Sequence, residues 1–258
     1  MPFGPDVVAL LLFAAFVAGC IDAVAGGGGL ITLPALLGAG LPPVAALGVN
    51  KAQSSFGVAA ALLAYTRRGL VDFAGLRWTV LAVFLGSGLG TFLIMDLNAG
   101  VARAIIPLLL LGASAYFLLS PKMDEVERHR RLGPAGFGAT AAAIGFYDGF
   151  FGPGTGSFFA LALVALLGFG VTRATANTKL LNFTSNVASL YLLALGGAVL
   201  LPLALLMAAA SMAGATLGAR LALRFGARLI RPLLVVISLG LTARVLLDPA
   251  NPLRGWFN

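Results

Sequence analysis

The chain has 258 residues, of which 60% are hydrophobic and only 10% charged, and its formal net charge is +8. Soluble domains usually carry about 25% charged residues, so a chain this apolar could not cover a soluble surface, and we expect a lipid bilayer around it. The positive charge lies mostly in short loops between apolar segments, where orientation signals belong. No basic stripe with interleaved aromatic residues is present, so we expect no nucleic-acid partner.

Gly, Pro and charged residues divide the chain into five apolar segments per half. The first half is predicted to hold segments 6–24, 30–40, 44–65, 74–95 and 101–119. The second half is predicted to hold segments 134–150, 155–168, 172–195, 202–222 and 228–247. The second segment of each half is too short for a hydrocarbon core of about 30 Å, so it should be a half-helix or re-entrant segment buried in protein.

The two halves repeat one arrangement of an Asp, a glycine cluster and a Lys. The first copy has Asp22, the run Gly26–Gly29 and Lys51, and the second has Asp148, the run Gly152-Pro-Gly-Thr-Gly156 and Lys179. A duplicated membrane unit with broken helices and buried charges is typical of a secondary transporter. The predicted fold is therefore an all-α polytopic membrane protein with two repeats, about eight long transmembrane helices and two short broken or re-entrant helices.

Equivalent loops of the two halves carry opposite charge bias. The loop at 66–77 contains three Arg, whereas its counterpart at 196–201 contains no charge. The loop at 96–103 contains one Arg, whereas its counterpart at 220–231 contains four. Because positive loops stay in the cytoplasm, equivalent loops are predicted on opposite sides of the membrane and the repeats are predicted to be inverted. A chance scatter of Arg residues is the alternative.

This topology gives the predicted division of the chain. Residues 1–119 form the first transmembrane repeat, 120–133 a cytoplasmic linker and 134–258 the second transmembrane repeat. An odd number of crossings per half would place both termini outside the cytoplasm.

Lys51 and Lys179 are the strongest candidates for a binding site. Each lies about 11 Å into its predicted helix, and a charge at the centre of a membrane helix costs about 2.5–3.5 kcal/mol on insertion scales. Two such lysines at equivalent positions therefore indicate function. The alternative is structural, with each lysine paired with Asp22 or Asp148 or extended along its helix. Polar residues near the two lysines predict a lining for the site: Asn50, Gln53, Ser54, Asn177 and Asn182.

The glycine clusters predict broken helices with unpaired backbone N–H groups, which favour anions. Gly27, Gly28, Gly29, Gly154 and Thr155 are therefore added to the predicted substrate-binding set. Close helix packing is the alternative role of glycine in membranes. It explains the glycines at 86–90 well, but it explains four consecutive glycines beside an intramembrane Asp poorly.

Asp22 and Asp148 each end the first segment of their half. Either carboxylate could be a salt-bridge partner, a cap for the broken helix or a proton carrier for coupled transport. No catalytic constellation accompanies them: the only His, His129, lies in the charged linker, and the only Cys, Cys20, is distant from it in sequence. We therefore expect no enzyme activity, no metal site and no cofactor.

The motifs resemble those of the sulfite exporter TauE/SafE family of membrane permeases, over essentially the whole chain. They read Gly19-x-x-Asp22-Ala-x-x-Gly-Gly-Gly-Gly-Leu30-x-Thr-x-Pro34, Gly48-x-Asn50-Lys51, Gly145-Phe-Tyr-Asp148-Gly-Phe-Phe-Gly-Pro-Gly-Thr-Gly156 and Ala176-Asn-Thr-Lys179-x-x-Asn182. The copies differ in that Thr178 precedes Lys179 where Asn50 precedes Lys51. The resemblance implies a duplicated permease of the inner membrane, associated with export of sulfite, sulfonates or related organosulfur anions.

The expected function is a secondary transporter that exports a small anion by alternating access at a midplane site between the two repeats. An anion channel, and a membrane subunit or receptor that transports nothing, are the alternatives. The expected partners are the small anionic substrate, the lipid bilayer and, as one option, protons, and the oligomeric state stays open. The expected location is the inner (plasma) membrane, with several crossings.

Overall fold

A computed structural model describes residues 3–97, 101, 109 and 132–225. Within these residues the chain forms eight α-helices and no strand. Segment 101–119 lies outside the described residues except for residues 101 and 109, and segment 228–247 lies wholly outside them.

The helix bounds agree closely with the predicted segments. The helices are α1 (Pro5–Ala25), α2 (Gly29–Gly38), α3 (Pro43–Thr66), α4 (Arg77–Asp96), α6 (Pro134–Phe150), α7 (Thr155–Leu167), α8 (Val171–Leu195) and α9 (Leu201–Phe225). Each bound lies within three residues of the prediction. The two short helices are confirmed, with 10 residues in α2 and 13 in α7.

Three of the described helices, α1, α4 and α9, are long and apolar enough to cross a bilayer. Helices α3 and α8 are as long, with 24 and 25 residues, but they carry the polar side chains of the predicted site. Large apolar side chains such as Trp78, Leu89 and Phe92 on α4 are about two-thirds exposed. Exposed apolar surface of this kind suits lipid rather than water, so the structure is that of a membrane protein.

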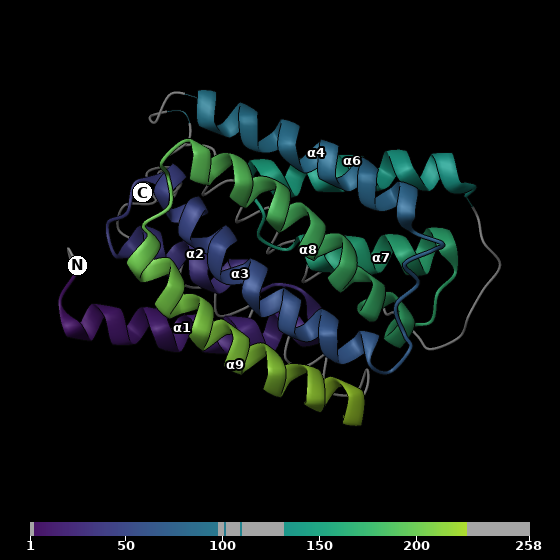
Figure 1. Ribbon diagram of the computed structural model, residues 1–258, viewed down its shortest axis with the longest axis horizontal. Helices are drawn as coiled ribbons and strands as arrows, with labels where there is room; N and C mark the ends of the chain where they lie inside the picture. Colours follow the sequence, from purple (N-terminus) through teal and green to yellow (C-terminus); the bar gives the residue numbers. More distant parts are fainter. Residues whose placement is uncertain (1–2, 98–100, 102–108, 110–131, 226–258) are drawn as a thin grey trace, which may run out of the picture.

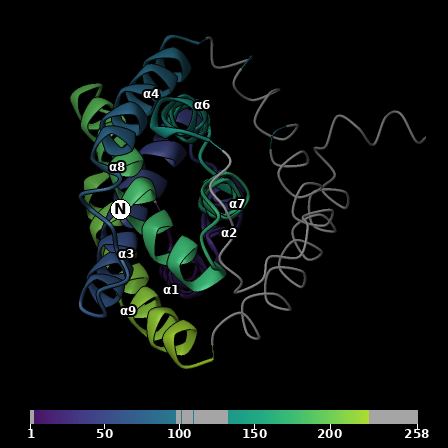
Figure 2. The same ribbon diagram turned by 90° about the vertical axis from the view of Figure 1, so that its right-hand side faces the viewer.

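Helices of one half of the chain pack against helices of the other half. In Figure 1, α4 and α6 run along the upper edge, α1 and α9 along the lower edge, and α3 and α8 lie between these pairs. The last described helix of each half packs on the first helix of the other half, α4 on α6 and α9 on α1. Helices α3 and α8 contact each other, and the short helices α2 and α7 lie on one side of this central pair (Figure 2).

Glycines set the close approach of the paired helices. A Cβ added at Gly86 or Gly90 of α4 would collide with backbone of α6, and one added at Gly214 or Gly218 of α9 would collide with backbone of α1. The carbonyl oxygens that these Cβ atoms would meet belong to Ala142, Phe146, Phe16 and Cys20 respectively. Small residues allow this backbone-to-backbone packing in membranes. The packing holds α4 and α9 against the C-terminal parts of α6 and α1, and the site begins where these two helices end.

Candidate functional site

Both predicted glycine breaks are present. Helix α1 ends at Ala25, and Gly26 follows with φ 74°, a left-handed conformation that favours glycine. Helix α6 ends at Phe150, and Gly152 and Gly154 follow with φ of 97° and 89°. In each case a short helix begins a few residues later.

The two breaks touch each other across the molecule. A Cβ on Gly26 would lie 2.6 Å from the Cα of Gly156, so only glycine backbones can meet there. The hydroxyl of Ser157 donates a hydrogen bond of 2.7 Å to the carbonyl oxygen of Gly26. The contact places the start of α7 against the end of α1, and it brings one Asp and one glycine break from each half to a common centre.

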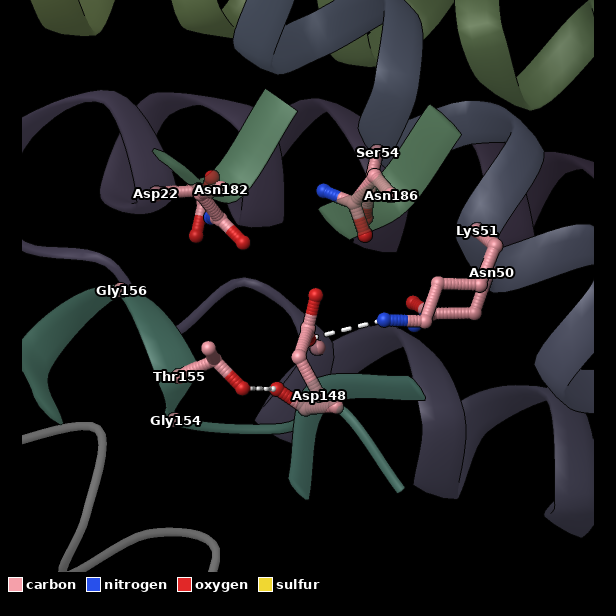
Figure 3. Close-up of a pocket in the computed structure, with 12 residues that line it drawn as sticks. Asp22, Asn50, Lys51, Ser54, Asp148, Gly154, Thr155, Gly156, Asn182 and Asn186 are labelled. Carbon is pink, nitrogen blue, oxygen red and sulfur yellow. Dashed lines mark hydrogen bonds and ion pairs between the residues drawn. The ribbon is translucent and has the colours of Figure 1, made fainter. Parts of the chain in front are cut away.

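Lys51 forms a buried ion pair with the Asp of the other half. The distance from its Nζ to Oδ1 of Asp148 is 2.8 Å, and the side chains are 1% and 3% exposed (Figure 3). The second carboxylate oxygen, Oδ2, accepts a hydrogen bond from the hydroxyl of Ser185 on α8. Gly152 leaves room for the pair, because a Cβ there would lie 3.1 Å from the lysine nitrogen.

Lys179 is also buried, but its contact differs. Its Nζ donates a hydrogen bond to the backbone carbonyl oxygen of Asp22, not to the carboxylate. The carboxylate of Asp22 instead accepts hydrogen bonds from the N–H groups of Gly27 (3.0 Å) and Gly28 (3.3 Å) at the start of α2. Asp148 therefore forms a salt bridge and Asp22 caps the first break, two of the roles that the sequence left open. The third role, that of a proton carrier, stays a prediction.

A small polar cavity of about 20 Å³ lies between the breaks and the central helices. Predicted site residues supply most of its wall: Asp22, Gly29, Asn50, Lys51, Ser54, Asp148, Gly154, Thr155 and Asn182. Gly152, Gly156 and Asn186 complete it. Figure 3 shows the labelled members of this lining around one space, and α3, α8 and both breaks contribute to it. A volume of this size holds about one water molecule, so an anion of four or more heavy atoms would require the site to open.

The other predicted site residues do not line this cavity: Gln53, Gly27, Gly28, Lys179 and Asn177. Gln53 is buried on α3, where its Nε2 donates to the hydroxyl of Ser54 (2.8 Å) and to Oδ1 of Asn50 (3.3 Å). The N–H groups of Gly27 and Gly28 are held by Asp22. Lys179 reaches toward the end of α1 and thereby joins α8 to the first break.

Asn177 has a different position from the one expected of a binding residue. It lies near the start of α8, where its Oδ1 accepts a hydrogen bond of 2.8 Å from the N–H of Asp72. Its Nδ2 donates to the carbonyl oxygens of Leu70 (3.1 Å) and Arg173 (2.8 Å). The bonds to Asp72 and Leu70 attach the loop between α3 and α4 to α8, and Asn177 is not part of the cavity wall.

Three polar residues of the site were missing from the predicted set. Asn186 follows Lys179 by seven residues and therefore shares its helix face, so the helical spacing does indicate it as part of a polar stripe, although it was not included in the predicted substrate-binding set. Ser185 contacts Asp148 only through the packing of α8 on α6, and Thr32 donates to Oδ1 of Asn50 only because α2 folds back on α3. No local pattern in the sequence indicates these two contacts.

Within the described part of the chain, no group of three His, Cys, Asp or Glu residues could hold a metal ion. Cys20 is a free, half-buried cysteine on α1, and His129 lies outside the described residues.

The outer helices expose apolar surface that suits lipid, and they surround broken helices and buried charges. These are features of membrane transporters. The comparisons with known proteins agree. The family described as "Sulfite exporter TauE/SafE" matches residues 11–245, and the chain belongs to this family.

Several curated relatives cover nearly the whole chain. A "Probable membrane transporter protein ORF9" from Sinorhizobium is 48% identical over 97% of this chain and 96% of its own length. A "Probable membrane transporter protein" from Haemophilus influenzae is 45% identical over the full length of both chains. The "Probable membrane transporter protein YfcA" of Escherichia coli is 43% identical over 95% of this chain and 91% of its own. No solved structure matches the chain. The protein is a membrane transporter of this family.

Proposed function

We propose that the protein is a secondary transporter of the inner membrane that exports a small anion, either sulfite, a sulfonate or a related organosulfur anion. The observation that carries this proposal is the pair of buried lysines beside a polar cavity where two glycine breaks meet. Lysines buried in a membrane protein are costly, and they are usually retained for a substrate or ion pathway.

An anion would bind by placing one of its oxygens on Lys51 in place of the Asp148 carboxylate. In the closed site the charge of Lys51 is balanced by Asp148 at 2.8 Å. An incoming anion would replace Oδ1 of Asp148 on the lysine, while Oδ2 keeps the hydroxyl of Ser185. The amides of Asn182 and Asn186 line the same cavity and would donate to the remaining oxygens of the anion.

Two features support a carrier with alternating access. The cavity holds about one water molecule, as expected of an occluded conformation that must open to take substrate. The reciprocal packing of α4 on α6 and α9 on α1 gives each half equivalent contacts with the other. Together with the opposite charge bias of equivalent loops, this supports two inverted repeats that rock against each other around the central site.

The substrate class follows from the chemistry and from the family description. One lysine ammonium, amide donors and a hydroxyl suit a compact anion with several oxygens, and the sulfur oxyanions and short sulfonates have this form. Protons are one candidate for the coupled ion. Substrate binding would separate the Asp148 carboxylate from Lys51, and the carboxylate could then take up a proton.

The proposal is tested with the purified protein in liposomes. The panel is sulfite, sulfate, taurine, sulfoacetate and chloride, each with and without a pH gradient. We expect saturable flux of one sulfur anion that is accelerated by the same anion on the opposite side. Flux without saturation or acceleration would indicate a channel, and no flux of any member would contradict the proposed substrate class.

A further inference from the structure

A second small cavity shares Asp22 and Ser54 with the first. It has a volume of about 10 Å³ and lies between α1, α3 and α9. Its oxygen-bearing side chains are those of Asp22, Gln53, Ser54 and Ser211. This space corresponds to about one water molecule or one dehydrated small ion. Gly19 and Gly57 form part of the wall and allow α9 to approach closely.

Gln53 presents an unused acceptor at this cavity. The side chain is 1% exposed, and its Oε1 has no hydrogen-bond partner among the described residues. The orientation of the amide is set by its Nε2, which donates to Oδ1 of Asn50 and to the hydroxyl of Ser54. A buried carbonyl oxygen without a partner costs about 1–3 kcal/mol, so a ligand that supplies positive charge would be stabilised there.

Asp22 supplies the negative charge. Its carboxylate has the two backbone N–H groups of Gly27 and Gly28 as donors but no ion pair with a side chain in the described part of the structure. Asp22 also lies in the last turn of α1, where helix carbonyls give a partial negative charge. A carboxylate, an amide oxygen and two hydroxyls are oxygen ligands of the kind that hard cations prefer.

The equivalent place related by the repeat lacks this arrangement. With the 128-residue offset that relates Lys51 to Lys179, the counterpart of Gln53 is Leu181 and the counterpart of Ser211 is Val83. Both counterparts are buried and apolar. The counterpart of Asp22 is Asp148, whose carboxylate is occupied by Lys51. Two of the four lining side chains, Gln53 and Ser211, are therefore replaced by apolar residues at the equivalent place, so this lining is not a general consequence of the repeated fold.

We propose that the cavity formed by Asp22, Gln53, Ser54 and Ser211 binds one small monovalent cation, with sodium as the best match. One carboxylate and neutral oxygens near two lysines suit a single positive charge better than a divalent ion. If the proposed anion transport holds, this cation is a second candidate for the coupled ion besides protons, because Asp22 and Ser54 line both cavities. Sodium bound there would neutralise Asp22 and so favour an anion beside Lys51.

Sodium binding is measured directly on the purified full chain, by equilibrium binding of radioactive sodium and by thermal unfolding in NaCl, KCl or choline chloride at equal ionic strength. We expect saturable sodium binding near one ion per chain, and a higher unfolding temperature in NaCl alone. Gln53→Leu and Ser211→Ala should each weaken sodium binding at least tenfold. Gln53→Glu, which keeps an oxygen at this position, should retain it.

Thr91→Ala is the matched control, because Thr91 is a buried hydroxyl residue of α4 that lines neither cavity, and its counterpart in the other half is Ala219. It should bind sodium like the wild type. Equal effects of all three salts, or unchanged sodium binding in both Gln53→Leu and Ser211→Ala, would overturn the site. Anion flux measured both in NaCl and in choline chloride separates the two proposals. Flux that depends on Lys51 without any sodium binding removes only the cation site, whereas sodium binding without anion flux in either buffer removes only the proposed transport.

Discussion

Neutralising one partner of the Lys51–Asp148 ion pair should destabilise the protein more than neutralising both partners. The two charges are 2.8 Å apart and almost fully buried. Removing one leaves the other buried without a partner, which typically costs about 3–5 kcal/mol. For a chain of this length that corresponds to a fall of roughly 6–20 °C in unfolding temperature. Lys51→Met and Asp148→Asn should each show a fall of this size.

The double variant Lys51→Met/Asp148→Asn should lie within about 1–2 kcal/mol of the wild type, because neither charge is left unpaired. Thermal unfolding in detergent measures all four proteins of the cycle. Asp72→Asn is the control, since Asp72 pairs with Arg173 at 3.7 Å with both side chains more than a third exposed. Such a pair contributes about 1 kcal/mol at most. If the destabilisation of the double variant equals the sum of the two single destabilisations, the two residues do not interact and the assigned ion pair is refuted.

Three further predictions concern the surrounding structure. Gly90→Ala should lower the free energy of unfolding by about 1–3 kcal/mol, because its Cβ would lie 2.8 Å from the amide nitrogen of Phe150. Gly88→Ala should not, since its Cβ would make only an ordinary contact of 3.9 Å with Cδ1 of Leu192; equal unfolding temperatures would contradict the packing. Gly152→Ala should abolish anion flux, since φ is 97° and the Cβ would press on the ion pair, and normal flux in liposomes would argue against that geometry. Asn177→Leu should speed proteolysis of the α3–α4 loop, because it removes the two hydrogen bonds that join this loop to α8. It should leave anion affinity within about twofold, and lost affinity would return Asn177 to the binding set.

The helices and their breaks could be read from the sequence because their signals are local. Gly26 and Gly152 interrupt apolar segments, and each adopts a left-handed conformation that other residues rarely accept. Pro43 and Pro134 begin α3 and α6, as proline does at the first turn of a helix. The lysines could be recognised for a similarly local reason, because a charge inside an apolar membrane segment is costly whatever the segment packs against.

The partners of those charges could not be read in the same way. The two halves repeat Asp, glycine and Lys, yet Asp148 pairs with Lys51 while Asp22 caps its own break. That difference depends on long-range packing: Ser185 reaches Asp148 only because α8 crosses α6, and its counterpart in the first half is Gly57. Asn177 was similarly ambiguous, because its role depends on the loop between α3 and α4 folding back onto α8.

The central claim is that Lys51 binds a transported anion and does not serve only to balance Asp148. The most direct test is sulfur-anion flux in liposomes that contain the double variant Lys51→Met/Asp148→Asn, compared with wild-type liposomes of equal protein content. We expect the double variant to remain folded and to lose saturable flux. Wild-type flux in the folded double variant would show that the pair is structural, and the proposed anion site would then be wrong.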